Sequence, residues 1–211
     1  MPQIPGRSKI ISLGPTPDLA RAECAIRALS QVGRPVKYHL PYPNGGTNPS
    51  AKGPEDVETM QADCIADAAW NRGFDRFQYD FPLYDGYINT DSMLDEAMLR
   101  GSNTDTGRQI AKSAPWFKVL AAPLIGCFLV GRTFFSKTRL RNVTGHIGTV
   151  VEIHPGGEDG RDLSKIMVVH CSPYNYQFTD GKSAIWKTDA RIWGAYPTLK
   201  FVDFVWSGGP R

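Results

Sequence analysis

The sequence is poor in the residues from which metal centres and disulfide frameworks are built. Its 211 residues include only four cysteines and four histidines. No two cysteines form a Cys-x-x-Cys pair, and no His or Cys pair has the short spacing typical of zinc ligands. Four cysteines in a chain of this length are also too few for a disulfide scaffold. We therefore expect no metal and no other cofactor.

The sequence also lacks long apolar runs and a strong charge of one sign. The longest apolar stretch, residues 119–130, contains Pro123 and Gly126 and falls short of the ~20 residues of a membrane helix. The amino terminus has no apolar core of the kind found in signal peptides. We expect a protein that is made in the cytoplasm. If it acts at the cell wall, it would reach the wall through another delivery system or after cell lysis. A net charge of +3 suits an anionic surface but is too weak to indicate nucleic acid.

The length predicts one domain. Residues 1–16 carry three prolines and two glycines, which is typical of a flexible arm, and residues 17–211 form the domain. Apolar spacing predicts helices at 17–32, 64–73 and 92–99, with Thr90 or Asp91 as the cap of the third. Short apolar runs predict strands at 116–120, 127–130, 148–153, 165–170, 184–187 and 201–206. Helices followed by strands indicate an α+β fold, with the helices packed on an antiparallel sheet or partial barrel.

One cysteine lies where a helix is expected to begin. Cys64 follows Asp63 and precedes apolar residues at helical spacing, up to Gly73. Unpaired backbone N–H groups and the helix dipole at such a position favour the thiolate, which is the nucleophilic form. A small buried cysteine on a core helix is the plainer alternative. The other cysteines, at positions 24, 127 and 171, fall on predicted apolar faces or strands and are expected to pack in the core.

Two histidines lie at the ends of neighbouring predicted strands. His146 comes just before the strand at 148–153, between two glycines, and His170 ends the strand that follows. If the two strands form an antiparallel pair, the start of one lies beside the end of the other. With Cys64 packed against the same end, the chain would hold a nucleophile, a base and a residue that orients the base.

These residues resemble the NlpC-type papain-like cysteine peptidases, a fold that also includes the CHAP amidases. Members carry Asp-Cys-Ser-Gly, then His-Val-Gly-Ile, then a third polar residue that is often histidine. Here the corresponding segments are Asp63-Cys64, Gly145-His146-Ile147-Gly148 and His170, in the same order. Residues 38–46 are a looser version of a Tyr-x-x-Gly-Gly loop, and residues 81–92 resemble a segment of phage and prophage members. Ile65-Ala66 replaces the Ser-Gly that follows the cysteine.

The resemblance implies hydrolysis of amide bonds in peptidoglycan stem peptides by a triad of Cys64, His146 and His170. In the family, the aspartate before the cysteine and a tyrosine of the upstream loop help to recognise the substrate's amine end. Those roles are carried over to Asp63 and Tyr38. Backbone N–H groups at the helix start would form the oxyanion hole. Long loops at 34–56 and 74–90 are expected beside the site, because such loops in compact domains are often functional.

Three alternatives remain open at this point. The same Cys-His pair would serve an acyltransferase or an amidase with another substrate. A non-catalytic module on this fold would bind a wall fragment or a partner, and it is favoured if Cys64 is buried away from both histidines. A zinc site made from Cys64, His146 and His170 is the third alternative.

Overall fold

The computed structural model describes residues 17–38, 61–62, 64–72, 89–99 and 117–204. Within these ranges three α-helices precede most of the strands. They are α1 (Pro17–Gln31), α2 (Cys64–Asn71) and α3 (Thr90–Leu99). Two two-residue strands, β1 (Lys37–Tyr38) and β2 (Gln61–Ala62), pair in parallel between α1 and α2. The expected arm at 1–16 and most of the loops expected at 34–56 and 74–90 lie outside the described residues.

The remaining strands build one large sheet and one hairpin. The sheet contains β3 (Phe117–Leu120), β4 (Phe128–Gly131), β7 (His146–Ile153), β8 (Ile166–Cys171), β9 (Ile185–Asp189) and β10 (Leu199–Phe204). Their order is β3-β10-β4-β7-β8-β9, and every neighbouring pair is antiparallel. The strands β5 (Phe134–Ser136) and β6 (Arg141–Val143) form a separate hairpin between β4 and β7. The expected α+β class with an antiparallel sheet is confirmed.

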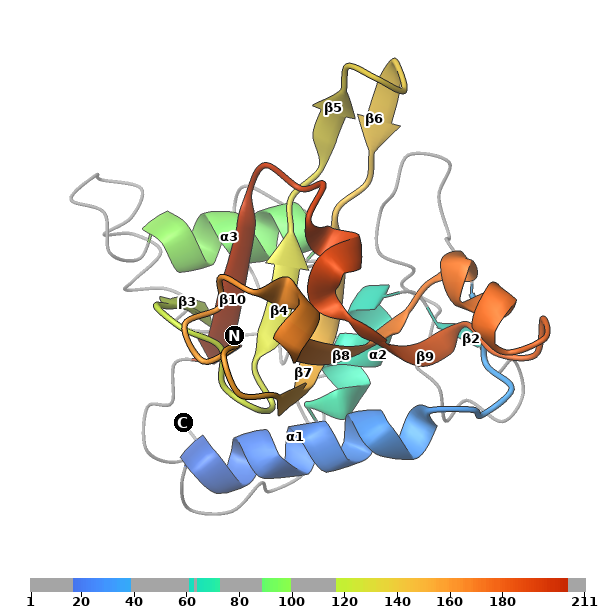
Figure 1. Cartoon of the computed structure of the whole chain (residues 1–211), viewed down its shortest axis with the longest axis horizontal. Coiled ribbons are helices and arrows are strands. Elements are labelled where there is room, and N and C mark those ends of the chain that lie inside the picture. Colours follow the sequence, from blue (N-terminus) through green and yellow to red (C-terminus); the bar gives the residue numbers. More distant parts are fainter. Residues whose placement is uncertain (1–16, 39–60, 63, 73–88, 100–116, 205–211) are drawn as a thin grey trace, which may run out of the picture.

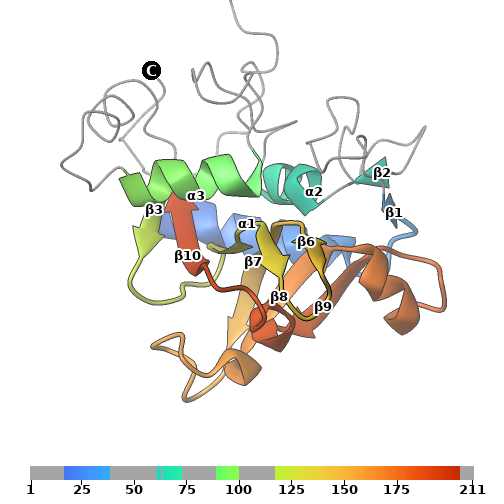
Figure 2. The same ribbon diagram turned by 90° about the horizontal axis from the view of Figure 1, so that it is seen from above.

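The sheet has a helical face and a loop face. Figure 2 shows α1, α2 and α3 together on one side of the strands. Short 3-10 helices η1 (Leu163–Lys165) and η3 (Ala190–Trp193) pack on the other side, and η2 (Pro173–Phe178) joins β8 to β9. Because side chains alternate along a strand, each strand contributes to both sides. Phe128 and Val130 of β4 belong to the core under α2 and α3, whereas Leu129 belongs to the core with Trp193.

Buried polar contacts attach α2 to the sheet. The Asn71 side-chain amide donates to Thr149 Oγ1 of β7 at 3.3 Å. The Arg72 guanidinium pairs with Asp203 of β10 at 3.4 Å, and Arg21 of α1 pairs with the other carboxylate oxygen at 2.9 Å. The Arg72 and Asp203 side chains are each 3% exposed. Two helices and one strand therefore meet at the buried carboxylate of Asp203. It lies at the C-terminal end of α2, whereas Cys64 is at the N-terminal end.

One helix cap differs from the expectation. We expected Thr90 or Asp91 to cap the third helix, but the cap is Asn89. The Asn89 side-chain oxygen accepts from the backbone N–H of Ser92 at 2.9 Å, and the Ser92 hydroxyl accepts from the Asn89 N–H at 2.8 Å. This reciprocal pair satisfies two N–H groups at the helix start, and Thr90 becomes the first helical residue.

Candidate functional site

The two histidines singled out from the sequence are in contact. β7 and β8 pair antiparallel, with Thr149 opposite Val169, which places Gly148 opposite His170. His146 Nε2 and His170 Nδ1 lie 2.8 Å apart and share a hydrogen bond. A side chain at position 148 would clash here, because an added Cβ would come within 2.9 Å of the His170 Cβ. Gly148 therefore leaves the space in which the imidazoles meet.

The hydrogen bond continues to a third residue. His170 Nε2 lies 3.1 Å from the Thr188 hydroxyl of β9. When His170 Nε2 donates to Thr188, His170 Nδ1 accepts the proton of His146 Nε2. His146 Nδ1 is then left with a lone pair. The reversed arrangement, in which the threonine hydroxyl donates, leaves His146 Nδ1 protonated. The first arrangement is the one in which His146 can act as a base.

A buried tryptophan covers both imidazoles. The Trp193 ring is stacked on His146, with centroids 5.1 Å apart and planes at 22°, and meets His170 edge-on at 4.8 Å. Burial lowers the pKa of His146 from 6.5 to about 4. Burial also lowers the pKa of His170 well below its usual value, and the charge of His146 adds to that shift. Both rings are therefore neutral at neutral pH, which suits a base rather than a standing thiolate–imidazolium pair.

Cys64 is the first residue of α2, as expected. Its side chain is 8% exposed and belongs to the core on the helical face, which also contains Val130 and Ile147. Ile147 precedes Gly148 and follows His146, so the imidazole points to the opposite face of the sheet. The described contacts include no hydrogen bond between Cys64 and either histidine. The structure therefore joins His146 to His170 and leaves the thiol on the other side of β7.

The thiol nevertheless lies at the same end of the sheet as His146. Burial raises the pKa of Tyr196 to about 12, and the charge of Cys64 contributes to that shift. Cys64 also packs in the same core as Ile147, the second residue of β7. The Tyr196 hydroxyl donates to the Thr144 carbonyl at 2.9 Å, two residues before His146. The first turn of α2 and the start of β7 are therefore neighbours.

The other three cysteines are buried in the core. Burial raises the pKa of Cys24 to about 11 and that of Cys127 to about 12. Cys171 lies in the core formed with α1 and β9, on the face of β8 opposite to His170. All four cysteines are among the described residues, and they form no disulfide. The surroundings of Cys24, Cys127 and Cys171 fit packing roles.

Tyr38 reaches the neighbourhood of α2 through the small parallel sheet. It pairs with Ala62, two residues before Cys64, and its backbone N–H donates to the Tyr176 hydroxyl at 2.8 Å. Its side chain is partly buried against the core under α1. Asp63, the second residue expected to bind substrate, lies outside the described residues.

The described part of the chain offers no compact metal site. Across its ranges, no three His, Cys, Asp or Glu side chains converge closely enough to hold a metal ion. Cys64, His146 and His170 are all included in that search, so they do not form the zinc site that was considered as an alternative. In the same ranges, none of the helices has the length and apolar character needed to cross a bilayer.

The sequence pattern did not reveal Trp193, Thr188 and Tyr196. Thr188 lies one residue beyond the strand expected at 184–187, and Trp193 lies in a 3-10 helix whose residues have no strand or α-helix period. A tryptophan four residues after a strand carries no local signal of what it covers. Trp193 reaches the histidines only because η3 packs over that face of the sheet.

Comparisons with known proteins leave the chain without an assigned family. No family model, curated protein or solved structure matches it.

Proposed function

We propose that the chain is a cysteine hydrolase of papain-like fold that cleaves amide bonds in peptidoglycan stem peptides. The observation that carries the proposal is the His146–His170 hydrogen bond at the end of the sheet where α2 begins with Cys64. A hydrogen bond through His146 Nε2 leaves Nδ1 as the nitrogen available to a thiol. Thr188 continues the chain behind His170 and would help to set its tautomer.

The proposed reaction uses these atoms in two steps. His146 Nδ1 takes the proton of the Cys64 thiol as the sulfur attacks the substrate carbonyl. Backbone N–H groups at the start of α2 would stabilise the oxyanion. The imidazolium then gives its proton to the departing amine, which leaves a thioester on Cys64. A water molecule, deprotonated by His146, hydrolyses the thioester and restores the thiol.

This chemistry requires the sulfur and the imidazole to approach each other. Because the two side chains start on opposite faces at one end of the sheet, either the His146 ring turns away from Trp193 or the first turn of α2 shifts along β7. His146 is the first residue of β7 and retains some exposure. Of the two movements, we therefore expect the turn of the His146 ring rather than the shift of α2. A substrate that binds the productive arrangement more tightly would shift the population toward it.

The test is release of new amino groups from purified peptidoglycan. Wild-type protein should release them, whereas Cys64→Ala and His146→Ala should remain folded and abolish the release. His170→Ala should lower the rate less severely, because the base remains. Cys171→Ala serves as a control, since the Cys171 side chain packs in the core on the face of β8 opposite to His170. Hydrolysis that persists in Cys64→Ala would overturn the proposal.

A second candidate function has its own supporting observation. Cys64 is 8% exposed and lies on the opposite face from both histidines, which is the arrangement expected for a module that binds without cleaving. Such a module would sediment with peptidoglycan, release no amines, and bind equally well as Cys64→Ala. The same peptidoglycan preparation therefore separates hydrolysis from binding alone.

A further inference from the structure

The β5–β6 hairpin projects from the sheet next to the candidate site. Figure 1 shows it extending beyond β4 and β7, away from all three helices. Phe134 pairs with Val143 at its base, and the Phe134 ring packs on Tyr196 with centroids 5.4 Å apart. Ser136 pairs with Arg141 at the far end, and residues 137–140 form the turn. The hairpin therefore has an anchored base and a tip that the described structure leaves in solvent.

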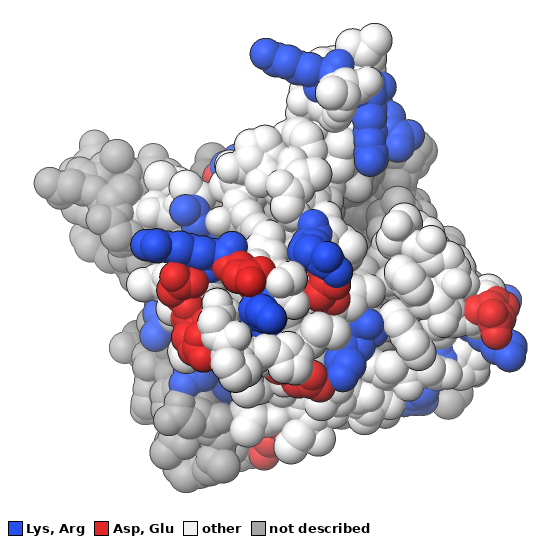
Figure 3. Space-filling model, in the orientation of Figure 1, with Lys and Arg blue, Asp and Glu red and all other residues white. Residues whose placement is uncertain are grey.

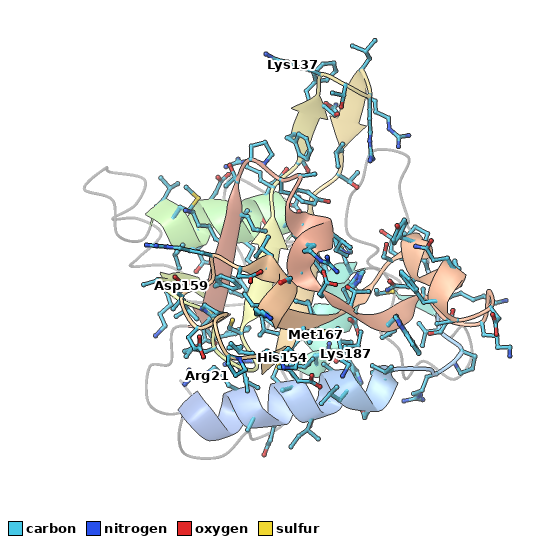
Figure 4. All side chains as sticks on the ribbon, in the orientation of Figure 1. Arg21, Lys137, His154, Asp159, Met167 and Lys187 are labelled. Carbon is cyan, nitrogen blue, oxygen red and sulfur yellow. The ribbon has the colours of Figure 1, made fainter. Side chains whose placement is uncertain are left out.

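The tip is positively charged. Lys137, Arg139 and Arg141 are all exposed, and the sequence has no acidic residue between positions 132 and 151. These three charges equal the net charge of the whole chain, +3, so the remaining residues balance one another. None of the three forms an ion pair within the described ranges, whereas Arg132 at the hairpin base pairs with Asp95 at 2.6 Å. Figure 3 shows the basic side chains gathered on the projection, and Figure 4 shows Lys137 at its extremity.

Apolar side chains accompany the charges. Leu140 is 78% exposed, the largest value among the large hydrophobic residues of the described structure, and Phe135 is 59% exposed. Leu140 also has a left-handed backbone, with φ of 49°. Glycine or asparagine normally occupies such a position, because the Cβ of other residues comes too close to a carbonyl oxygen there, and asparagine offsets this with local hydrogen bonds. An exposed leucine in this conformation improves neither the folding of the turn nor the solubility of the chain.

We propose that the tip of the β5–β6 hairpin docks on an anionic lipid membrane. Cations next to exposed apolar side chains match a surface of charged headgroups over acyl chains. A nucleic acid or an anionic wall polymer would use the cations but has no apolar layer for Leu140. Figure 1 shows the tip beyond the rest of the described structure, so it can enter the headgroup region while the sheet stays outside. This docking is independent of the proposed hydrolysis.

Co-sedimentation with lipid vesicles tests the proposal. The protein is mixed with vesicles of phosphatidylcholine alone or of phosphatidylcholine with phosphatidylglycerol. We expect binding only to the anionic vesicles, weakening as salt is added. Each cation near such a surface contributes roughly five-fold to the partition coefficient, so Lys137→Glu and Arg139→Glu should each weaken binding at least that much. Lys182→Glu, which changes an exposed lysine near η2, is the matched control and should bind normally.

Leu140→Asn separates a docking role from a structural one. Asparagine tolerates the left-handed backbone, so the variant should melt at the same or a higher temperature while it binds vesicles several-fold more weakly. Ile26→Gln removes an apolar side chain that is 65% exposed on α1, and it should leave vesicle binding unchanged. Binding that is unaffected by both Leu140→Asn and Arg139→Glu would overturn the proposal. So would failure to bind anionic vesicles, or displacement by short duplex DNA with no effect of Leu140→Asn.

Discussion

His146 and His170 share one proton across the 2.8 Å between Nε2 and Nδ1. The tautomer of one ring therefore determines that of the other, and Thr188 biases the pair from the far side of His170. Because Trp193 covers both rings, protonation of either ring to the imidazolium is energetically unfavourable. This relationship makes the pair sensitive to acid.

The first prediction concerns stability at low pH. The folded-state pKa of His146 is about 4, below the value near 6.5 expected for the unfolded chain. Between these values the unfolded chain binds more protons, so the free energy of unfolding falls as the pH drops from about 6.5 to 4. We expect the two histidines together to lower the free energy of unfolding by on the order of 2 kcal/mol. This value allows for solvent screening of the partly exposed His146. Urea denaturation at pH 7 and at pH 4.5 measures it.

His170→Gln is the control for that measurement. It keeps a polar side chain next to Thr188 but removes one titrating group and its repulsion of His146. The variant should be less stable at pH 7 and should lose less stability between pH 7 and pH 4.5. An equal loss in both proteins would assign the acid sensitivity to other groups.

The second prediction concerns the reactivity of the cysteines. Burial raises the pKa of Cys24 to about 11 and of Cys127 to about 12, so neither supplies thiolate at neutral pH. Cys64 alone among the four has measurable exposure, at 8%, and it begins a helix. Alkylation of the native protein, followed by mass spectrometry from pH 4 to 9, should modify Cys64 first. His146→Ala should slow that reaction if His146 serves as its base, and equal rates at all four cysteines would argue against a nucleophile.

The third prediction concerns the buried ion pair under α2. Asp203→Ala leaves the Arg72 guanidinium buried without its partner, and removal of one member of such a pair typically costs 3–5 kcal/mol. Chemical denaturation should show a loss of about that size. Asp159→Ala is the control, because Asp159 and its partner Arg161 are largely exposed, with side chains 58% and 90% accessible. It should cause no measurable loss.

The fourth prediction concerns the glycine beside the histidines. In Gly148→Ala the new methyl group would lie 2.5 Å from Val168 Cγ1 and 2.9 Å from the His170 Cβ. We expect a loss of roughly 1–3 kcal/mol from overpacking and a displaced His170 ring, visible as changed imidazole signals in NMR spectra. Gly181→Asn is the control, since position 181 has a left-handed backbone with open space around it. Unchanged His170 signals in Gly148→Ala would contradict the packing described here.

Much of the local structure follows from the sequence by itself. Apolar spacing predicted α2 from Cys64, and the runs at 148–153 and 165–170 predicted β7 and β8. Their short connection made an antiparallel pair the simplest arrangement, and that pair brings His146 to His170. These features depend on neighbours in the chain, for which periodicity and turn residues are sufficient signals.

Tertiary structure alone decided which side of the sheet each functional group occupies. The spacing of residues does not say whether a helix packs on the face of Ile147 or on that of His146, and a shift of one residue exchanges the two. Asn71 and Arg72 settle the choice through Thr149 and Asp203, and η3 brings Trp193 over the histidines. Contacts between residues more than 40 positions apart leave no periodic trace in the sequence, so the separation of Cys64 from His146 emerges only when the helices and the sheet are packed together.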